Sequence, residues 1–219
     1  MMALPFTTVG FDLDGTLLDT ARDLGAALNH ALCTIGRNAV PNEAIRTLIG
    51  GGSALMLRRG LSMTGGESGI DFNALRQVLL TYYEANIADQ TKLFPGGEVM
   101  LDALAAAGLK IAVVTNKPHG LAVKLLDALG LSPRFAAIIG GGIHPLKPAP
   151  DALHAMVAAC GGGRAAYVGD TTFDTGAAKA AGLPSIAVSF GFNDLPARQL
   201  GADAVIDHFD ALIPALSRL

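Results

Sequence analysis

The chain has 219 residues, a length that suits one large domain or a core with a small accessory domain. Hydrophobic residues make up 51% of the chain, the formal net charge is −3, and lysine and arginine form no run. This composition supplies a sizeable core, and it argues against a nucleic acid or an anionic membrane surface as partner.

The pattern predicts neither a signal peptide nor a membrane-spanning segment. The first residues lack a basic start with a long apolar stretch, and no segment is apolar over the ~20 residues that a membrane span needs. Cys33 and Cys160 lie far apart in helical patterns, and we expect two reduced, half-buried thiols. The expected location is the cytoplasm.

The first predicted element is a short apolar strand over residues 7–13, which runs into the sequence Asp-Leu-Asp-Gly-Thr. Apolar residues then recur at helical spacing from residue 24 to residue 35, and Gly36 ends this helix. Further helical segments are predicted from Asn42, around Arg58 and from Phe72. From about residue 18 to about residue 90, the pattern is therefore helical throughout.

After residue 96 the pattern changes, because helical runs now alternate with short apolar strands. These strands are predicted at residues 110–115, 136–140, 165–169, 185–189 and 204–206. Repeated strand–helix units with apolar strands are typical of a parallel sheet covered on both faces. We predict an α/β fold with a Rossmann-like, doubly wound core over residues 1–17 and 93–219, interrupted by an all-helical insertion over residues 18–92.

Polar residues follow several of the predicted strands, and ligands of parallel α/β sheets bind beyond the carboxyl ends of the strands. These residues are Asp12, Asp14 and Thr16 after the first strand, Thr115 and Asn116 after the second, Lys147 in a later loop, and Gly169, Asp170 and Asp174 at the fourth. We expect them to meet at one edge of the sheet and to form the active site.

Several of these residues are carboxylates, which repel one another unless a cation balances their charge. Asp12 and Asp14 are two residues apart, so an extended chain points both the same way, and Asp170 adds a third acidic group. Sites built from oxygen ligands suit Mg²⁺. The five histidines show no spacing that would build a zinc site. We therefore predict Mg²⁺ as the cofactor.

The same residues form a complete set for transfer of a phosphoryl group. A carboxylate beside Mg²⁺ can attack phosphorus, and a second carboxyl can protonate the leaving oxygen and then activate water. Thr115, Asn116 and Lys147 can hold the equatorial phosphoryl oxygens in the transition state. The predicted substrate is a small phosphorylated metabolite.

Four motifs in order resemble those of the haloacid dehalogenase-like superfamily, and together they span nearly the whole chain. They are Phe-Asp-Leu-Asp-Gly-Thr at residues 11–16, Thr-Asn-Lys at 115–117, Lys-Pro at 147–148 and Gly-Asp-Thr-Thr-Phe-Asp at 169–174. The resemblance implies that Asp12 is the nucleophile and Asp14 the acid and base. It also implies Mg²⁺ ligation by Asp12, Asp170 and the Asp14 backbone carbonyl, and it matches the helical insertion to the mobile cap of that family.

Finer features are similar to those of phosphoglycolate phosphatases. The stretches concerned are residues 48–52, 113–118, 139–142 and 147–151. Gly142 departs from the Asp expected there, and Pro-Ala-Pro replaces the more usual Pro-His-Pro. Both departures leave the catalytic set intact. The resemblance implies 2-phosphoglycolate as the substrate.

Other functions on the same fold remain as alternatives. They are a sugar-phosphate phosphatase or phosphomutase, a dehalogenase, a phosphonatase and a non-catalytic binding module. Asp14 argues against a dehalogenase, which needs no second carboxylate, and the absence of lysine from residues 18–89 argues against a phosphonatase. The pattern does not decide between a monomer and a homodimer.

Specificity is expected to come from the helical insertion, because the core motifs read only the phosphoryl group. Phosphoglycolate carries a carboxylate, and its binding needs backbone N–H donors or a cation. Residues 18–89 of the insertion have six arginines and no lysine, and the glycine turn leads into a predicted helix, whose N-terminus attracts anions. We expect the substrate to contact Gly50, Gly51, Gly52 and Ser53, helped by one of these arginines.

Overall fold

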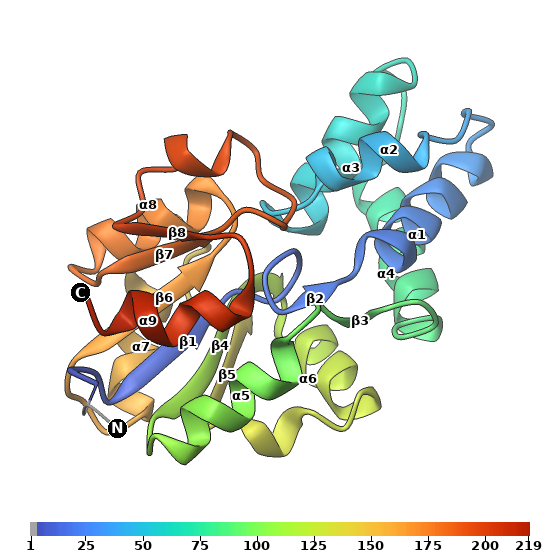
Figure 1. Ribbon diagram of the computed structural model, residues 1–219. Helices are drawn as coiled ribbons and strands as arrows, with labels where there is room; N and C mark the ends of the chain where they lie inside the picture. The colour runs from blue at the N-terminus through green and yellow to red at the C-terminus, as the bar shows by residue number, and fades with distance from the viewer. Residues whose placement is uncertain (1–3) are drawn as a thin grey trace.

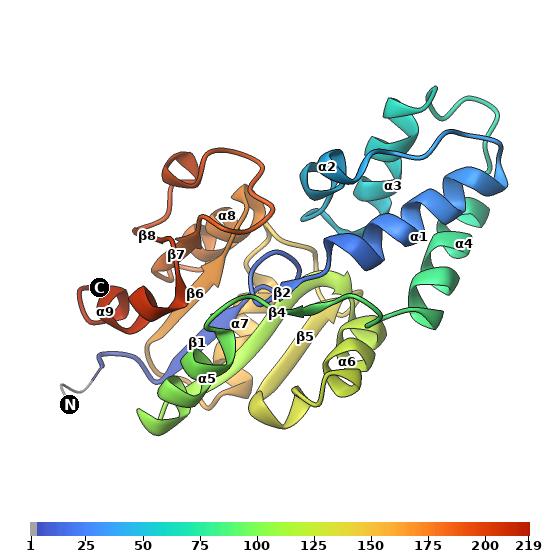
Figure 2. The same ribbon diagram turned by 45° about the vertical axis from the view of Figure 1, so that its right-hand side comes forward.

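The structure is a computed structural model and describes residues 4–219. A parallel sheet of six strands, in the order β5-β4-β1-β6-β7-β8, forms the larger lobe (Figures 1 and 2). Its strands are β1 (Thr8–Phe11), β4 (Lys110–Pro118), β5 (Ala137–Gly141), β6 (Ala165–Gly169), β7 (Ser185–Val188) and β8 (Ala204–Ile206). The chain order reverses on either side of β1, so the carboxyl ends of β1, β4 and β6 meet at a topological switch point, where α/β sheets bind ligands.

Helices cover both faces of this sheet, as its apolar strands require. One face packs against α5 (Gly97–Ala106), α6 (His119–Ala128) and α9 (Leu212–Leu216), through alternate strand residues such as Val9, Phe11 and Val113. The other face packs against α7 (Asp151–Ala159) and α8 (Thr172–Ala180), through Val114 and Tyr167. Since successive side chains of a strand point to opposite faces, this alternation produces the doubly wound core.

The smaller lobe is helical and lies beyond the carboxyl ends of the central strands (Figure 1). It contains α1 (Ala21–Thr34), α2 (Asn42–Ile45), the short 3₁₀ turn η1 (Arg46–Leu48), α3 (Gly52–Met63) and α4 (Phe72–Ala85). Asp71 caps α4 by accepting a hydrogen bond from the Ala74 N–H at 3.0 Å. Leu75, Leu79 and Tyr83, four residues apart, form the buried face of α4.

A two-stranded antiparallel ribbon connects the lobes, and the sequence did not predict it. Strand β2 (Leu18–Asp19) pairs with β3 (Lys92–Leu93) where the chain leaves and re-enters the core. Both strands have two residues, which is too short to leave an alternating pattern. The lobe boundaries at residues 17 and 93 stay a prediction, and this ribbon lies at both of them.

The predicted α/β class, with a parallel core and an inserted helical cap, is confirmed. The expectation of two half-buried thiols was wrong in detail, because Cys33 is exposed on α1 while Cys160 is buried at the end of α7; neither forms a disulfide. Within residues 4–219, the helices are too short or too polar to cross a membrane. The cytoplasmic location stays a prediction.

Candidate active site at the carboxyl edge of the sheet

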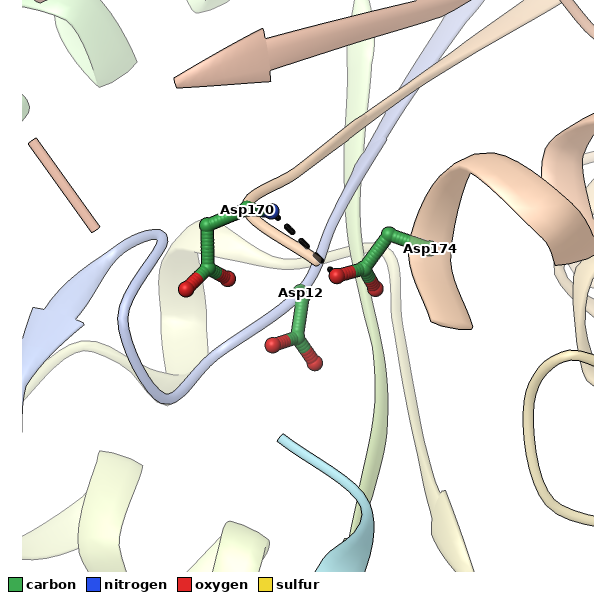
Figure 3. A group of neighbouring side chains, drawn as sticks. All are labelled: Asp12, Asp170 and Asp174. Atoms are coloured by element: carbon green, nitrogen blue, oxygen red, sulfur yellow. Dashed lines mark hydrogen bonds between the residues drawn. The ribbon is translucent and has the colours of Figure 1, made fainter. Parts of the chain in front are cut away.

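Three carboxylates meet where β1 and β6 end. Asp12 follows β1, Asp170 follows β6, and Asp174 lies in the first turn of α8. They offer oxygen atoms that all lie within 4.8 Å of one another, and all three residues are buried. Figure 3 shows the three side chains around one point, with the Asp170 backbone N–H directed at Asp174.

Lys147 supplies the positive charge beside this cluster. Its Nζ lies 2.7 Å from Asp12 Oδ1, 2.6 Å from Asp174 Oδ1, 2.8 Å from the Tyr167 hydroxyl and 3.1 Å from the Val114 carbonyl, so its three protons are shared among four acceptors. Lys147 is 3% exposed. A buried ammonium with these contacts is held at a fixed place beside Asp12, and it balances one of the three negative charges.

Asp174 shapes the loop that carries Asp170. Its Oδ2 accepts the backbone N–H groups of Asp170 at 3.2 Å and Thr171 at 3.0 Å, and so completes a capping box at the start of α8. Gly169 makes room for this contact, because a Cβ there would lie 2.3 Å from the Asp174 Cβ. The supporting roles predicted for Gly169 and Asp174 stay a prediction; the structure brings the two residues together at the start of α8.

Asp170 is oriented by hydrogen bonds from two other segments. Thr16 Oγ1 donates to Asp170 Oδ1 at 2.7 Å, and the Phe192 N–H donates to Oδ2 at 2.7 Å. Asn193 Nδ2 donates to the Asp170 carbonyl at 2.8 Å. Gly15, at φ +89°, leaves the space beside this carboxylate, since a Cβ there would lie 2.3 Å from Asp170 Oδ2. The contacts from Phe192 and Asn193 carried no sequence signal.

Burial controls the protonation of these carboxylates. It raises the pKa of Asp12 to about 7, although the Lys147 ammonium acts to lower it. Burial and the neighbouring carboxylates Asp174 and Asp12 also raise the pKa of Asp170 well above its usual value. Three carboxylates beside one lysine leave an excess of negative charge, and oxygen atoms are the only ligands that the cluster offers. This donor set fits Mg²⁺.

Asp14 lies outside the three-carboxylate cluster. Its two carboxylate oxygens accept hydrogen bonds from Lys117 Nζ at 2.8 and 3.0 Å. The same ammonium lies 4.5 Å from the centre of the Tyr83 ring, which belongs to cap helix α4. Sequence reasoning quoted Lys117 in a motif but gave it no role, although its place directly after Asn116 was a usable signal.

The predicted phosphate-binding residues come together on β4 and its neighbouring loop. The Asn116 amide joins the two segments, since Nδ2 donates to the Lys147 carbonyl at 3.1 Å and Oδ1 accepts the Lys147 N–H at 2.8 Å. Thr115 Oγ1 accepts the Lys117 N–H at 3.2 Å, and Thr115 lines the pocket described next. Asn116 therefore positions Lys147 beside Asp12.

A pocket lies between these core residues and the cap. Its core wall includes Asp12, Asp14, Thr115, Asn116 and Lys117, and its cap wall includes Leu24, Ile49, Gly50, Gly52, Ser53, Met56, Leu79, Leu80 and Tyr83. The cap loop lies against the core. The Gly50 carbonyl lies 3.4 Å from Asn116 Nδ2, and a Cβ at Gly51 would lie 3.2 Å from Phe173. The cap thus stands closed over the site.

Of the residues expected to contact substrate in the cap, Gly50, Gly52 and Ser53 line this pocket, whereas Gly51 packs between Leu55 and Phe173. Arg76 Nε donates to Ser53 Oγ at 3.1 Å. The other five cap arginines bind elsewhere: Arg22 to Gln90, Arg37 to the carbonyls of Thr64 and Gly66, Arg46 to Asp19, Arg58 to Glu67, and Arg59 to the carbonyls of Thr47 and Ile49. Arg76 is thus the cap arginine joined to a polar side chain of the pocket wall.

Comparison with known proteins agrees with this geometry. Residues 9–188 match the family model described as haloacid dehalogenase-like hydrolase. The chain belongs to this family. It is 41% identical over 211 residues to the phosphoglycolate phosphatase of Agrobacterium fabrum, a match that covers 94% of this chain and 90% of the relative. It is 42% identical over 207 residues to that of Caulobacter vibrioides, covering 92% and 87%.

A solved structure of this haloacid dehalogenase-like family is also similar over nearly its whole length. The crystal structure of a protein described as a predicted phosphoglycolate phosphatase from Haemophilus somnus superposes with a TM-score of 0.89 at 29% identity, covering 96% of this chain and 97% of that one. The resemblance stated from the four motifs is confirmed, and so is the expectation of a phosphoric monoester hydrolase.

Proposed function

We propose that this phosphatase hydrolyses 2-phosphoglycolate, with Mg²⁺ as cofactor and a phosphoaspartate at Asp12 as the intermediate. One observation carries the proposal: the buried Asp12 carboxylate lies against Lys147 at 2.7 Å and within 4.8 Å of Asp170 and Asp174, on the wall of a pocket closed by the cap. The high identity to phosphoglycolate phosphatases supports the choice of substrate.

In the first half-reaction, an Asp12 carboxylate oxygen attacks phosphorus and the bond from phosphorus to the ester oxygen breaks. Asp14, on the same pocket wall, gives a proton to the leaving oxygen, so glycolate departs as an alcohol. We assign Lys147, Thr115 and Asn116 to the equatorial phosphoryl oxygens, because Lys147 Nζ lies 2.7 Å from Asp12 while Thr115 and Asn116 line the pocket. The closed cap excludes bulk water while the acyl phosphate forms.

In the second half-reaction, water attacks the phosphorus of the phosphoaspartate and phosphate leaves. Asp14 now takes the proton of the attacking water, and the Asp12 carboxylate is regenerated. The Lys117 ammonium, at 2.8 Å from Asp14 Oδ1, keeps the Asp14 carboxylate oriented toward the pocket between the two steps.

Mg²⁺ would be held by the carboxylates of Asp12 and Asp170, with the Asp14 backbone carbonyl, and it would screen the negative charges of nucleophile and phosphate. Asp174 lies in the same cluster, but its oxygens already serve Lys147 and the start of α8. We therefore assign Asp174 to positioning Lys147 and the loop that carries Asp170.

The cap supports a small, singly phosphorylated substrate. Its pocket wall is mostly apolar and carries no lysine or arginine of its own, within the residues that the structure describes. A phosphomutase would need to hold a second phosphate there, so this alternative loses support. We place the substrate carboxylate at the start of α3, against the backbone N–H groups and the Ser53 hydroxyl. Arg76 donates a hydrogen bond to Ser53 Oγ and so adds positive charge beside this position.

A screen of phosphorylated metabolites, with and without Mg²⁺, tests the proposal. We expect the highest kcat/KM for 2-phosphoglycolate, lower values for sugar phosphates, and no activation by sugar bisphosphates. A preference for a neutral sugar phosphate would refute 2-phosphoglycolate as the substrate and leave the phosphatase activity standing. Full turnover in EDTA would refute Mg²⁺ as the cofactor.

A further inference from the structure

Tyr83 of α4 has a buried hydroxyl whose proton has no acceptor among the described residues. The residue is 1% exposed and lines the pocket between cap and core. Its hydroxyl is buried and makes no hydrogen bond of full geometry among residues 4–219; its polar neighbour is the Lys117 ammonium, which can donate to it but cannot accept its proton. A buried polar group left without a partner costs about 1–3 kcal/mol, so a hydroxyl that persists in this state calls for a functional reason.

Three other buried hydroxyls lack partners, and their positions set Tyr83 apart. They belong to Thr8, Thr20 and Ser132, none of which lines the pocket. Among these four hydroxyl residues, Tyr83 is therefore the one on the pocket wall, within the part of the chain that the structure describes. Phenylalanine would fill nearly the same space without the cost, so the hydroxyl is not explained by packing.

The surroundings of Tyr83 favour an anionic oxygen. The Lys117 ammonium lies 4.5 Å from the ring centre. Burial lowers the pKa of Lys117, but the Asp14 carboxylate and Tyr83 outweigh this effect and hold it above its usual value. Burial raises the pKa of Tyr83 to about 12, so its hydroxyl keeps the proton at neutral pH. The corner thus combines a free O–H donor with a permanent cation.

The position of this corner matches the length of the proposed substrate. Asp14 serves the leaving oxygen in the proposed mechanism, and Lys117 touches Asp14 at 2.8 Å. In phosphoglycolate a single methylene separates the leaving oxygen from the carboxylate. The carboxylate must therefore lie close to Asp14, which is where Lys117 and Tyr83 meet.

We propose that Tyr83 is a specificity-determining residue of the cap, and that its hydroxyl, with the Lys117 ammonium beside it, forms a subsite for the carboxylate of the substrate. The inference rests on the proposed function and adds a named donor to it. A carboxylate has two oxygens with about four acceptor positions, so one oxygen can face Tyr83 while the other faces Ser53. Tyr83 lies on the cap helix α4 and Lys117 on the core strand β4, so the subsite depends on the cap being packed against the core.

The test measures binding without turnover. In an Asp12→Asn background, calorimetry compares 2-phosphoglycolate with ethyl phosphate, which has a methyl group in place of the carboxylate. Tyr83→Phe should weaken phosphoglycolate binding about 10- to 100-fold, the loss expected for a hydrogen bond to a charged group, and change ethyl phosphate binding far less. Tyr82→Phe is the matched control, since Tyr82 stacks on His30 at 4.2 Å and does not line the pocket.

A second readout does not depend on the substrate. Tyr83→Phe removes a hydroxyl whose proton has no acceptor, so the Tm of the free protein should change little, whereas loss of a structural hydroxyl would lower it. If both ligands lose affinity equally, or neither does, the subsite is refuted. If the Asp12→Asn protein with Tyr83 intact shows no preference for phosphoglycolate over ethyl phosphate, the proposed substrate fails. A preference that survives in Tyr83→Phe overturns only the role of Tyr83.

Discussion

The core site and the cap pocket use polar groups in different ways. Each charged group at the core edge has partners at short range, as Lys147 does with Asp12 and Asp174 at 2.7 and 2.6 Å. The cap wall is mostly apolar and offers few polar side chains, Ser53 and Tyr83 among them. The phosphoryl group is common to all substrates and meets a rigid network. In the proposed function, the variable part of the substrate meets the cap wall of the pocket, which lies between the two lobes.

The largest effect is expected from Asp12→Asn, which tests the core. Asparagine has nearly the same size, but its amide cannot attack phosphorus. We expect turnover to fall by at least ~10³-fold, a loss of roughly 4 kcal/mol of barrier stabilisation. The fold should persist, because the substitution removes a buried carboxylate whose pKa burial already raises to about 7. Steady-state kinetics and circular dichroism check this; a folded variant with substantial activity would refute the mechanism.

Removal of Mg²⁺ should impair the phosphoryl-transfer site in the core and not the cap pocket, so all substrates should be affected alike. EDTA should abolish activity toward every substrate, and Mg²⁺ should restore it. Ca²⁺ should inhibit, since its larger and looser coordination shell places the nucleophile badly. Kinetics with a carboxylate ester and a neutral ester measure whether both fail together. Activity that survives in EDTA for either ester contradicts the assignment.

The metal effect should depend on pH in a defined direction. The pKa of Asp12 in the folded protein, about 7, lies above its usual value of 3.8. At Asp12, the metal-free folded protein therefore binds a proton more tightly than the unfolded chain does. Ionisation of Asp12 lowers the free energy of unfolding as pH rises from 3.8 to about 7. Mg²⁺ needs the ionised carboxylate. Calorimetry should show a larger rise of Tm with Mg²⁺ at pH 8 than at pH 5; equal rises would contradict this account.

Asp14→Asn should have an effect that depends on the leaving group. Alkyl phosphates such as phosphoglycolate need a proton on the departing oxygen, and we expect a loss of about 10²- to 10⁴-fold for them. Aryl phosphates such as p-nitrophenyl phosphate leave without that help and should lose less. A Brønsted series of esters measures the difference. Equal losses across the series would mean that Asp14 serves the metal and not the leaving group.

The smallest effect is expected at the cap loop. Ser53→Ala and Arg76→Gln should each raise KM for phosphoglycolate about 3- to 10-fold, the value of one hydrogen bond, and should spare ethyl phosphate. Arg58→Gln is the matched control, because Arg58 pairs with Glu67 away from the pocket. A bulky residue at Gly51 is a poorer probe, since it would collide with Leu55 and Phe173 and hold the cap open for all substrates. Equal losses for both esters would make the loop structural.

Much of the core was predictable because its signals are local. The predicted strand over residues 165–169 agrees with β6, and 204–206 agrees with β8. Buried parallel strands are continuous apolar runs, and each polar residue after such a run lies at the same edge of the sheet. This is why Asp12 and Asp170 could be brought together from the sequence alone, although 157 residues lie between them.

The remaining contacts were not predictable, because they join segments whose relation only the folded chain defines. Phe192 reaches Asp170 through its backbone N–H, which every residue except proline carries. Tyr83 was not singled out from the sequence, and its distance to Lys117 depends on how the cap packs against the core. Helical periodicity predicts that a side chain is buried and does not predict which group it meets there.

The central claim is that Asp12 takes the phosphoryl group, and a trapping experiment tests it most directly. The protein is mixed with ³²P-labelled phosphoglycolate and Mg²⁺, quenched in acid within a turnover and digested, and the labelled peptide is identified. The account predicts an acid-stable, alkali-labile label on the peptide that contains Asp12, and no label in the Asp12→Asn protein. Label on another residue, or release of phosphate in a burst without any labelled protein, would contradict it.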